Sequence, residues 1–200
     1  MVRTLHLGLH PPPLTVHYPV IRIVPSVDSA ALNSFLTQLP EHSHLLFTSQ
    51  VAAKLLFHHS PSHLPPHLIA IGHATAQTLT ALGHPPHHIA TDATSEGVIA
   101  LLDQLSPTGL AWPHSARSRP VISHYCQQKG LPLLACSLYT TVNQQPGPPP
   151  DLNAFDAITF TSPSTVDGFF AIWTEIPNHL TINIIGSITQ KYLDQRQRRL

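Results

Sequence analysis

Short apolar runs alternate along this chain with segments whose apolar residues recur at helical spacing. The runs "TLHLGL" at Thr4–Leu9, "PVIRIVP" at Pro19–Pro25 and "HLLFTS" at His44–Ser49 predict three strands. Between the second and third strands, "SVDSAALNSFLTQL" at Ser26–Leu39 predicts a helix, because Asp and Ser stand near its start and apolar residues follow at helical intervals. The opening of the chain is therefore typical of strands connected by helices.

The same alternation continues through the rest of the sequence. Further strands are predicted for "LIAIG", "GLAWP", "LPLLACSLYTTV", "FDAITFTS" and "INIIG". Further helices are predicted for "QVAAKLLF", "HATAQTLTALG", "TSEGVIALLDQL", "RPVISHYCQQKG", the segment that ends at Trp173, and the last segment, which ends "DQRQRRL". Such alternation is typical of βαβ units on a parallel sheet. The Pro-rich segment Asn143–Asn153 has no periodicity and predicts a connector.

Two motifs of the first half return in the second half. "FTSQ" at Phe47–Gln50 corresponds to "FTSP" at Phe160–Pro163, and "AIGHATAQTL" at Ala70–Leu79 corresponds to "IIGSITQKYL" at Ile184–Leu193. The offset is nearly the same for both pairs, and a strand lies between the motifs in each half. We therefore expect an α/β fold of two similar domains, each a parallel sheet flanked by helices, rather than a solenoid of many short repeats.

Each repeated motif places small polar groups where a strand meets a helix. The candidate ligand-binding residues are Thr48, Ser49, Gly72 and Thr75 in the first copy and Thr161, Ser162, Ser164, Gly186 and Thr189 in the second. Ser162 is a good helix N-cap, and the following Pro163 suits the first helical position. Helix N-termini at the carboxyl ends of parallel strands suit an anionic ligand. For any single motif, a plain helix cap without a ligand is the favoured interpretation, and the pairing of the motifs weakens it.

Composition narrows the class of protein. Only 10% of the residues are charged and the formal net charge is zero, which argues against a partner such as nucleic acid or an anionic membrane surface. The two cysteines, Cys126 and Cys136, do not form a CxxC pair, which favours a reduced, cytoplasmic protein. The start of the chain is a poor signal peptide, and no apolar run approaches the length of a membrane span.

Together with "WPHSARSRPVISHYCQQKGLPLLACSLYTT", the paired motifs resemble the uroporphyrinogen-III synthase family, from about Pro19 to about Leu193. The resemblance implies two α/β domains joined by a two-stranded connector, with the active site in a cleft between them. Residues 1–18 plus 141–200 would form the outer domain and residues 24–135 the inner domain. Residues 19–23 and 136–140 would form the connector strands.

The resemblance also implies a reaction. The family cyclises hydroxymethylbilane, a linear polycarboxylate tetrapyrrole, to uroporphyrinogen III with inversion of ring D and loss of water, using no cofactor and no metal. It implies that Tyr139 assists departure of the hydroxyl group, although on the residues alone Tyr139 is an ordinary strand aromatic. Arg117 and Arg119 are candidates for binding substrate carboxylates, with solvated loop charge as the alternative. We further expect a monomer that receives its substrate from hydroxymethylbilane synthase.

The sequence departs from the family pattern at three places. Members usually open with a strand that ends in a Thr-Arg-type turn, where this chain reads "LGLHPPP", and Gln190 replaces the alanine of the second "IGxxTA". Members usually continue beyond the position of Leu200, so we expect an abbreviated outer domain.

Two other interpretations remain open. The runs with His58, His59, His63 and His67 and with His84, His87 and His88 suit a zinc site, but compositional bias is the simpler explanation, so we expect no metal. A two-domain protein that binds an anionic small molecule without chemistry is the alternative function.

Overall fold

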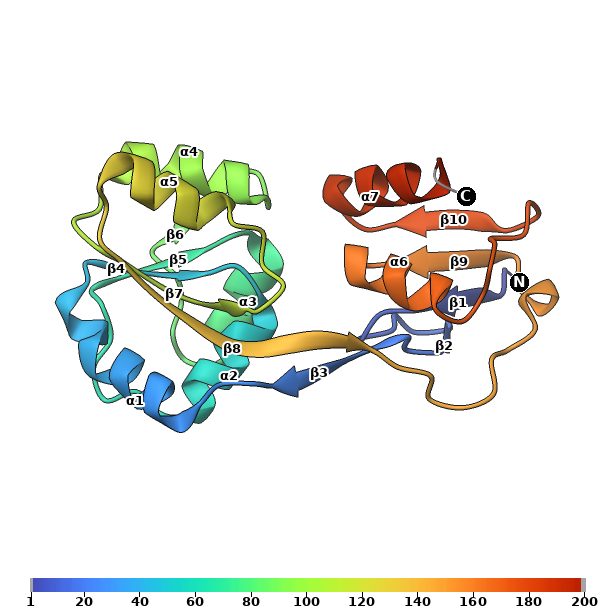
Figure 1. The fold of residues 1–200 in the computed structure, drawn as a ribbon, viewed down its shortest axis with the longest axis horizontal. Coiled ribbons are helices and arrows are strands. Elements are labelled where there is room, and N and C mark those ends of the chain that lie inside the picture. Colours follow the sequence, from blue (N-terminus) through green and yellow to red (C-terminus); the bar gives the residue numbers. More distant parts are fainter. Residues whose placement is uncertain (1, 199–200) are drawn as a thin grey trace. The chain divides into compact units, whose positions relative to one another are not determined.

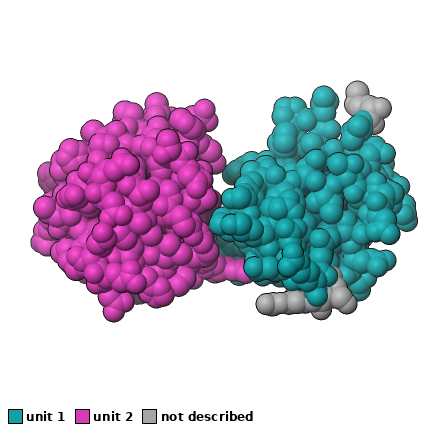
Figure 2. Space-filling model, turned by 90° about the horizontal axis from the view of Figure 1, so that it is seen from above, with its two compact units in different colours: residues 1–24, 141–200 teal, residues 25–140 magenta. Residues whose placement is uncertain are grey.

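The computed structural model describes residues 2–198, which divide into two compact units (Figure 2). Unit 1 comprises residues 1–24 and 141–200, and unit 2 comprises residues 25–140. The chain passes between the units in strand β3 (Ile21–Pro25) and in strand β8 (Leu133–Asn143), which are neighbours in one sheet. Of the residues predicted as connector strands, 19–23 span the start of β3 and the two residues before it, and they belong to unit 1. Residues 136–140 lie within β8 and belong to unit 2.

Unit 2 contains a sheet in the order β3-β8-β7-β4-β5-β6. The strands besides β3 and β8 are β4 (His44–Phe47), β5 (His67–Ala70), β6 (His88–Ile89) and β7 (Leu110–Ser115). From β8 to β6, every neighbouring pair is parallel. The carboxyl ends of these strands therefore lie at one edge of the sheet and their amino ends at the opposite edge.

Helices cover both faces of this sheet (Figure 1). They are α1 (Ser29–Gln38), which continues into the 3-10 turn η1 (Leu39–Glu41), α2 (Gln50–His58), α3 (His73–Ala81), α4 (Ser95–Leu105) and α5 (Val121–Lys129). Apolar side chains of α4 and α5 pack on Leu46, Ile69 and Trp112 of the sheet. Leu45 and Phe47 alternate with Leu46 along β4, so they face the opposite side, and they are fully buried.

Unit 1 is a smaller parallel sheet in the order β10-β9-β1-β2. Its strands are β1 (Thr4–His6), β2 (Val16–His17), β9 (Ala157–Phe160) and β10 (Thr181–Ile184), and its helices are α6 (Pro163–Phe170) and α7 (Ser187–Gln197), with a 3-10 turn η2 (Leu152–Ala154) before β9. The core is built around Leu5, Phe160 and Phe169, with Tyr18 and Trp173 in an edge-to-face contact. Gly168 lets α6 approach Val20 closely, because an added Cβ would lie 2.6 Å from the Val20 carbonyl oxygen.

The predicted fold class is confirmed: the protein is α/β, with parallel sheets flanked by helices and a pair of adjacent connecting strands. The sequence analysis missed β2 and β6, which are two residues long and therefore too short to show a period. The predicted last helix is present as α7, and its final residues 199–200 lie outside the described residues. Among residues 2–198, no helix is both long and apolar enough to cross a membrane.

Candidate functional site

In unit 2, the carboxyl end of β4 leads directly into the first repeated motif. After Phe47 the chain passes Thr48, and Ser49 then caps helix α2 with its side-chain oxygen, which accepts a hydrogen bond from the Ala52 N–H at 3.0 Å. The Thr48 hydroxyl accepts a bond from the indole N–H of Trp112 at 3.1 Å. Both hydroxyl groups are therefore held in place by bonds within unit 2.

Tyr139 on β8 lies against this motif. Its phenolic oxygen is 2.8 Å from the Ser49 Oγ, and Ser115, the last residue of β7, is its partner across the sheet. A shift in strand register brings Ser115 opposite Tyr139. His114 of β7 is opposite Ser137 of β8, but the next residue, Ser115, is opposite Tyr139, so Leu138 is the extra residue of a β-bulge in β8. Bulges of this kind re-aim side chains near functional sites. The structure thus gathers three hydroxyl groups at one edge of the sheet.

The bonds around Tyr139 define its chemical character. The Ser49 oxygen already accepts the Ala52 N–H, and the Ser115 oxygen already accepts the Arg117 N–H at 3.2 Å. The two hydroxyl protons are thus available to the phenolic oxygen, and the phenol can in turn donate its own proton to a ligand. Burial raises the pKa of Tyr139, and the bonds from Ser49 and Ser115 work in the opposite direction. Tyr139 is therefore a protonated phenol near neutral pH, with 5% of its surface exposed.

The second motif of unit 2 lies beside the first, because β5 pairs with β4. Helix α3 begins after Gly72, and none of the described side chains caps it. A Cβ at Gly72 would lie 2.8 Å from the Cβ of Ala93, so the close approach of these two segments requires glycine. The side chain of Thr75 is buried, which leaves the backbone at the start of α3 as the main group for an anion.

The two candidate arginines have different surroundings. Arg119 makes a bidentate ion pair with Glu96, with nitrogen–oxygen distances of 2.8 and 2.9 Å. These bonds to Glu96 raise the pKa of Arg119. The backbone N–H of Arg117 binds Ser115, the serine that contacts Tyr139. A substrate carboxylate at Arg119 has to compete with Glu96. Arg117 lies two residues after Ser115 in the chain.

Unit 1 repeats the pattern at the carboxyl ends of β9 and β10. Ser162 caps α6 in a capping box with Thr165, and the Thr165 oxygen accepts the N–H groups of Thr161 and Ser162 at 3.1 and 3.2 Å. The predicted cap at Ser162, with Pro163 in the first turn, is confirmed. Ser164 follows in the first turn of α6 and is partly exposed.

Helix α7 begins after Gly186, which has a φ of +86° and is uncapped by the described side chains, as Gly72 is in unit 2. The predicted binding residue Thr189 is buried inside the first turn of α7, as Thr75 is in α3. Each unit therefore has one helix capped by serine and a neighbouring helix that begins after glycine.

Three residues near these edges were missed by the sequence analysis. Thr165 and Ser115 are hydroxyl residues that bind the predicted site residues. His6 on β1 is 1% exposed, and neither of its ring nitrogens has a partner among the described residues. A Cβ on Gly8 would lie 2.5 Å from the Thr161 Oγ1 and 3.0 Å from the His6 Nε2, which places His6 and Thr161 at the same edge of the unit 1 sheet. Of these three residues, only Ser115 had a signal in the sequence, namely its position where the strand β7 ends.

Comparison with known proteins adds an independent observation. A family model described as uroporphyrinogen-III synthase HemD matches residues 14–199. The chain belongs to the uroporphyrinogen-III synthase family. A curated relative from Methanothermobacter thermautotrophicus, named "Putative uroporphyrinogen-III synthase", is 27% identical over 186 residues, which cover 82% of this chain and 74% of the relative.

Solved structures of the same kind share the fold. A uroporphyrinogen-III synthetase from Helicobacter pylori matches with a TM-score of 0.68 at 16% identity, covering 98% of this chain and 90% of its own. A mutant uroporphyrinogen III synthase from Thermus thermophilus matches with a TM-score of 0.65 at 18% identity, covering 98% and 89%. The family predicted from the paired motifs is thus confirmed, and with it an enzyme of this type in porphyrin and haem biosynthesis.

Proposed function

We propose that the protein converts hydroxymethylbilane into uroporphyrinogen III, with Tyr139 as the acid that assists loss of water. The observation that carries the proposal is the hydroxyl cluster of Tyr139, Ser49 and Ser115 at the carboxyl edge of the unit 2 sheet. Ligands of open α/β folds bind at such edges. The proposal rests on family membership for the reaction and on this cluster for the acid.

In the proposed reaction, the bond between the hydroxymethyl carbon on ring A and its hydroxyl oxygen breaks. The pyrrole nitrogen of ring A supplies the electron pair that stabilises the resulting carbon. The leaving oxygen takes up a proton and departs as water. In this proposal the phenol of Tyr139 donates to that oxygen, while the Ser49 hydroxyl donates to the phenolic oxygen and, with Ser115 beside it, stabilises the negative charge that develops there. The proton that the substrate loses when its rings regain aromaticity balances the one that left with water.

This chain has few charged residues, so we look to neutral groups for binding the substrate carboxylates. We assign this task to the starts of α3 and α7, where helices begin after Gly72 and Gly186 without a side-chain cap from the described residues. Hydroxyl groups beside the capped helices supply further contacts, from Thr48 and Ser49 in unit 2 and from Thr161, Ser162 and Ser164 in unit 1. Arg117 supplies a charged contact next to Ser115.

By the same resemblance, we propose that the chain works as a monomer in the cytoplasm, without a cofactor, and takes its substrate from hydroxymethylbilane synthase. Both cysteines are free thiols, buried in unit 2, which is compatible with a reducing compartment.

The isomer ratio of the product tests the function. Hydroxymethylbilane cyclises without an enzyme to the isomer in which ring D is not inverted, so the protein has to change the product and not merely its rate of formation. The substrate is generated in situ, the purified protein is added, and the products are oxidised and separated chromatographically. We expect isomer III in excess over a control without protein. Isomer I alone, from a sample shown by circular dichroism to be folded, contradicts the proposal and leaves the non-catalytic binding protein.

A further inference from the structure

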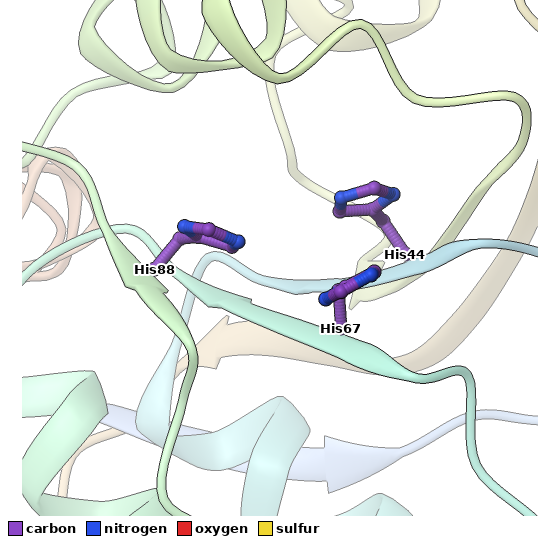
Figure 3. Close-up of side chains that lie close together, drawn as sticks. All are labelled: His44, His67 and His88. Atoms are coloured by element: carbon purple, nitrogen blue, oxygen red, sulfur yellow. The ribbon is translucent and has the colours of Figure 1, made fainter.

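Three histidines gather at the amino edge of the unit 2 sheet, opposite the edge that carries Tyr139. His44, His67 and His88 are the first residues of the adjacent strands β4, β5 and β6 (Figure 3). His44 is paired in register with His67, and His88 is paired with Ile69 on the same strand as His67. Residues far apart in the sequence are thus brought into one cluster by parallel pairing.

The alternation of side chains along each strand puts the three rings on one face. Leu46 and Ile69 lie two residues after His44 and His67, and Ala90 lies two residues after His88. These three apolar residues belong to the core that packs against α4 and α5. Since side chains two residues apart share a face of a strand, the histidines lie on this same face, at the border of the core. His44 is buried, His88 is partly exposed and His67 is exposed.

The spacing of the rings suits a shared ligand. One ring nitrogen from each histidine lies within 4.8 Å of the others. The centroids of the His44 and His67 rings are 4.8 Å apart, and those of His44 and His88 are 6.3 Å apart. Three imidazoles on tetrahedral Zn²⁺ have nitrogens roughly 3.4 Å apart, from zinc–nitrogen bonds of about 2.0–2.1 Å. Closing that difference requires rotation of the His67 and His88 rings, because the His44 and His67 rings are stacked at an interplanar angle of 28°.

The neighbours of His44 orient it as a metal ligand. Its Nδ1 lies 2.8 Å from the Ser43 Oγ, and the Ser43 hydroxyl can donate to the Gly109 carbonyl oxygen at 3.0 Å. The Ser43 Oγ also accepts the backbone N–H groups of Thr108 and Gly109 at 3.1 and 3.2 Å, and the tautomer of His44 decides whether Nδ1 donates to this oxygen or accepts from it. In the tautomer that carries its proton on Nδ1, the lone pair of Nε2 is available to a metal ion. Ligating histidines typically donate their second ring nitrogen to such a partner.

The surroundings of His44 disfavour its protonated form. Burial, followed by repulsion from His67, His88 and His87, lowers the pKa of His44 to about 4. Burial and the neighbouring His67 and His87 lower the pKa of His88 as well. His44 is therefore a neutral imidazole near pH 7, the form that a metal ion binds.

We propose that His44, His67 and His88 form a binding site for a divalent transition-metal ion that prefers imidazole, such as Zn²⁺, with water in the remaining position. The site ties together the amino ends of three strands and takes no part in the proposed reaction. The sequence analysis treated the histidine-rich runs as compositional bias. In the structure, the cluster contains one histidine from each run, His67 and His88, together with His44 from outside both runs. His84 is not in the cluster, and its ring stacks on Phe57.

Zinc titration of untagged protein tests the site, since a histidine tag would bind zinc itself. Metal content after dialysis gives the stoichiometry, and calorimetry gives the affinity. His67→Ala removes an exposed ligand, and His63→Ala is the matched control, because it removes an exposed histidine from the same loop without touching the cluster. We expect one tightly bound equivalent of zinc in the wild type and in His63→Ala. In His67→Ala we expect the affinity to fall by about 100-fold or more, which exceeds the cost of changing a residue that only hydrogen-bonds to a ligand.

Two further readouts separate this site from scattered binding by the many other histidines. Co²⁺ in a four-coordinate imidazole site absorbs strongly in the visible region, and this absorption should be present in the wild type and absent in His67→Ala. The isomer ratio of the reaction should be the same with and without a chelator. Equal zinc binding by the wild type, His67→Ala and a second variant, His88→Ala, overturns the proposal, as does a weak six-coordinate Co²⁺ spectrum.

Discussion

Replacing Tyr139 by phenylalanine removes one hydroxyl group and leaves the ring in place. The ring fills its position in β8 as before, so the change acts on the hydrogen bond to Ser49 and on the contact with Ser115. Neither serine oxygen is left without a partner, because Ser49 keeps the Ala52 N–H and Ser115 keeps the Arg117 N–H. We therefore expect a folded protein and an effect concentrated on the chemical step.

The two effects of this substitution differ in size. Losing the neutral hydrogen bond to Ser49 lowers the free energy of unfolding by about 0.5–1.5 kcal/mol. Losing an acid that donates to the leaving oxygen lowers kcat by about 10²–10⁴-fold, which corresponds to about 3–5 kcal/mol of transition-state stabilisation. In the proposed binding mode the substrate carboxylates contact the helix starts and not the phenol, so KM should change little.

The assay is the initial rate of isomer III formation over a range of substrate concentrations, together with urea unfolding of the same samples. Tyr125→Phe is the matched control, since it removes a buried tyrosine hydroxyl of unit 2 whose partner is Asp103 at 3.0 Å. The control should lose a similar amount of stability and keep its kcat. The assignment of Tyr139 as the acid is refuted if Tyr139→Phe keeps more than about a tenth of the wild-type kcat, or if the control loses as much activity.

Other substitutions test the surroundings of the site. Gly72→Ala should lower the free energy of unfolding by about 1–3 kcal/mol by overpacking, and Ala93→Gly in the same chain should restore most of it, as urea unfolding would show. Arg119→Gln should cost less than about 1 kcal/mol, because its ion pair with Glu96 is about half exposed, and Glu96→Gln should lower KM if Arg119 binds substrate. His6→Leu should raise the free energy of unfolding by about 1–3 kcal/mol at pH 7, because it removes two buried nitrogens without partners. Burial first, then His17 and His10, lowers the pKa of His6 in the folded protein. The unfolded chain then binds the proton more readily, and the gain from His6→Leu should grow as the pH falls below 6.5.

Local signals in the sequence predicted much of the fold. The N-cap at Ser162, the start of α4 at Thr94 or Ser95 and the helix end at Gly83 are all present. Each of these depends on a few neighbouring residues, because a cap needs one side-chain oxygen and a left-handed turn favours glycine. The family could be predicted from the repeated motifs for a similar reason, because their order along the chain is visible in the sequence without any knowledge of strand pairing.

The arrangement of the candidate site depends on strand register, which no local pattern shows. Ser115 meets Tyr139 only because a bulge shifts the pairing of β7 and β8 by one residue. A regular ladder would put Ser115 opposite Leu138 and turn it away from the phenol. His44 and His67 likewise become neighbours only through the parallel pairing of β4 and β5. Residues of ordinary type at ordinary positions thus gain a role from their partners across the sheet.

Each unit has one helix with a serine cap and a neighbouring helix without a cap from the described side chains. The side-chain oxygens of Ser49 and Ser162 accept backbone N–H groups in the first turns of α2 and α6. Part of the N–H groups at those two helix starts therefore already has a partner within the protein. The helices after Gly72 and Gly186 have no cap from the described side chains, and their first N–H groups are the better partners for a carboxylate. Glycine is required at both places for different reasons: a Cβ at Gly72 would meet Ala93, whereas Gly186 has a φ of +86° with open space around it. Under the proposed function, the pair of helices in each unit offers a polycarboxylate substrate two neutral donors together, because a capped helix beside an uncapped one provides a hydroxyl group and a free helix start.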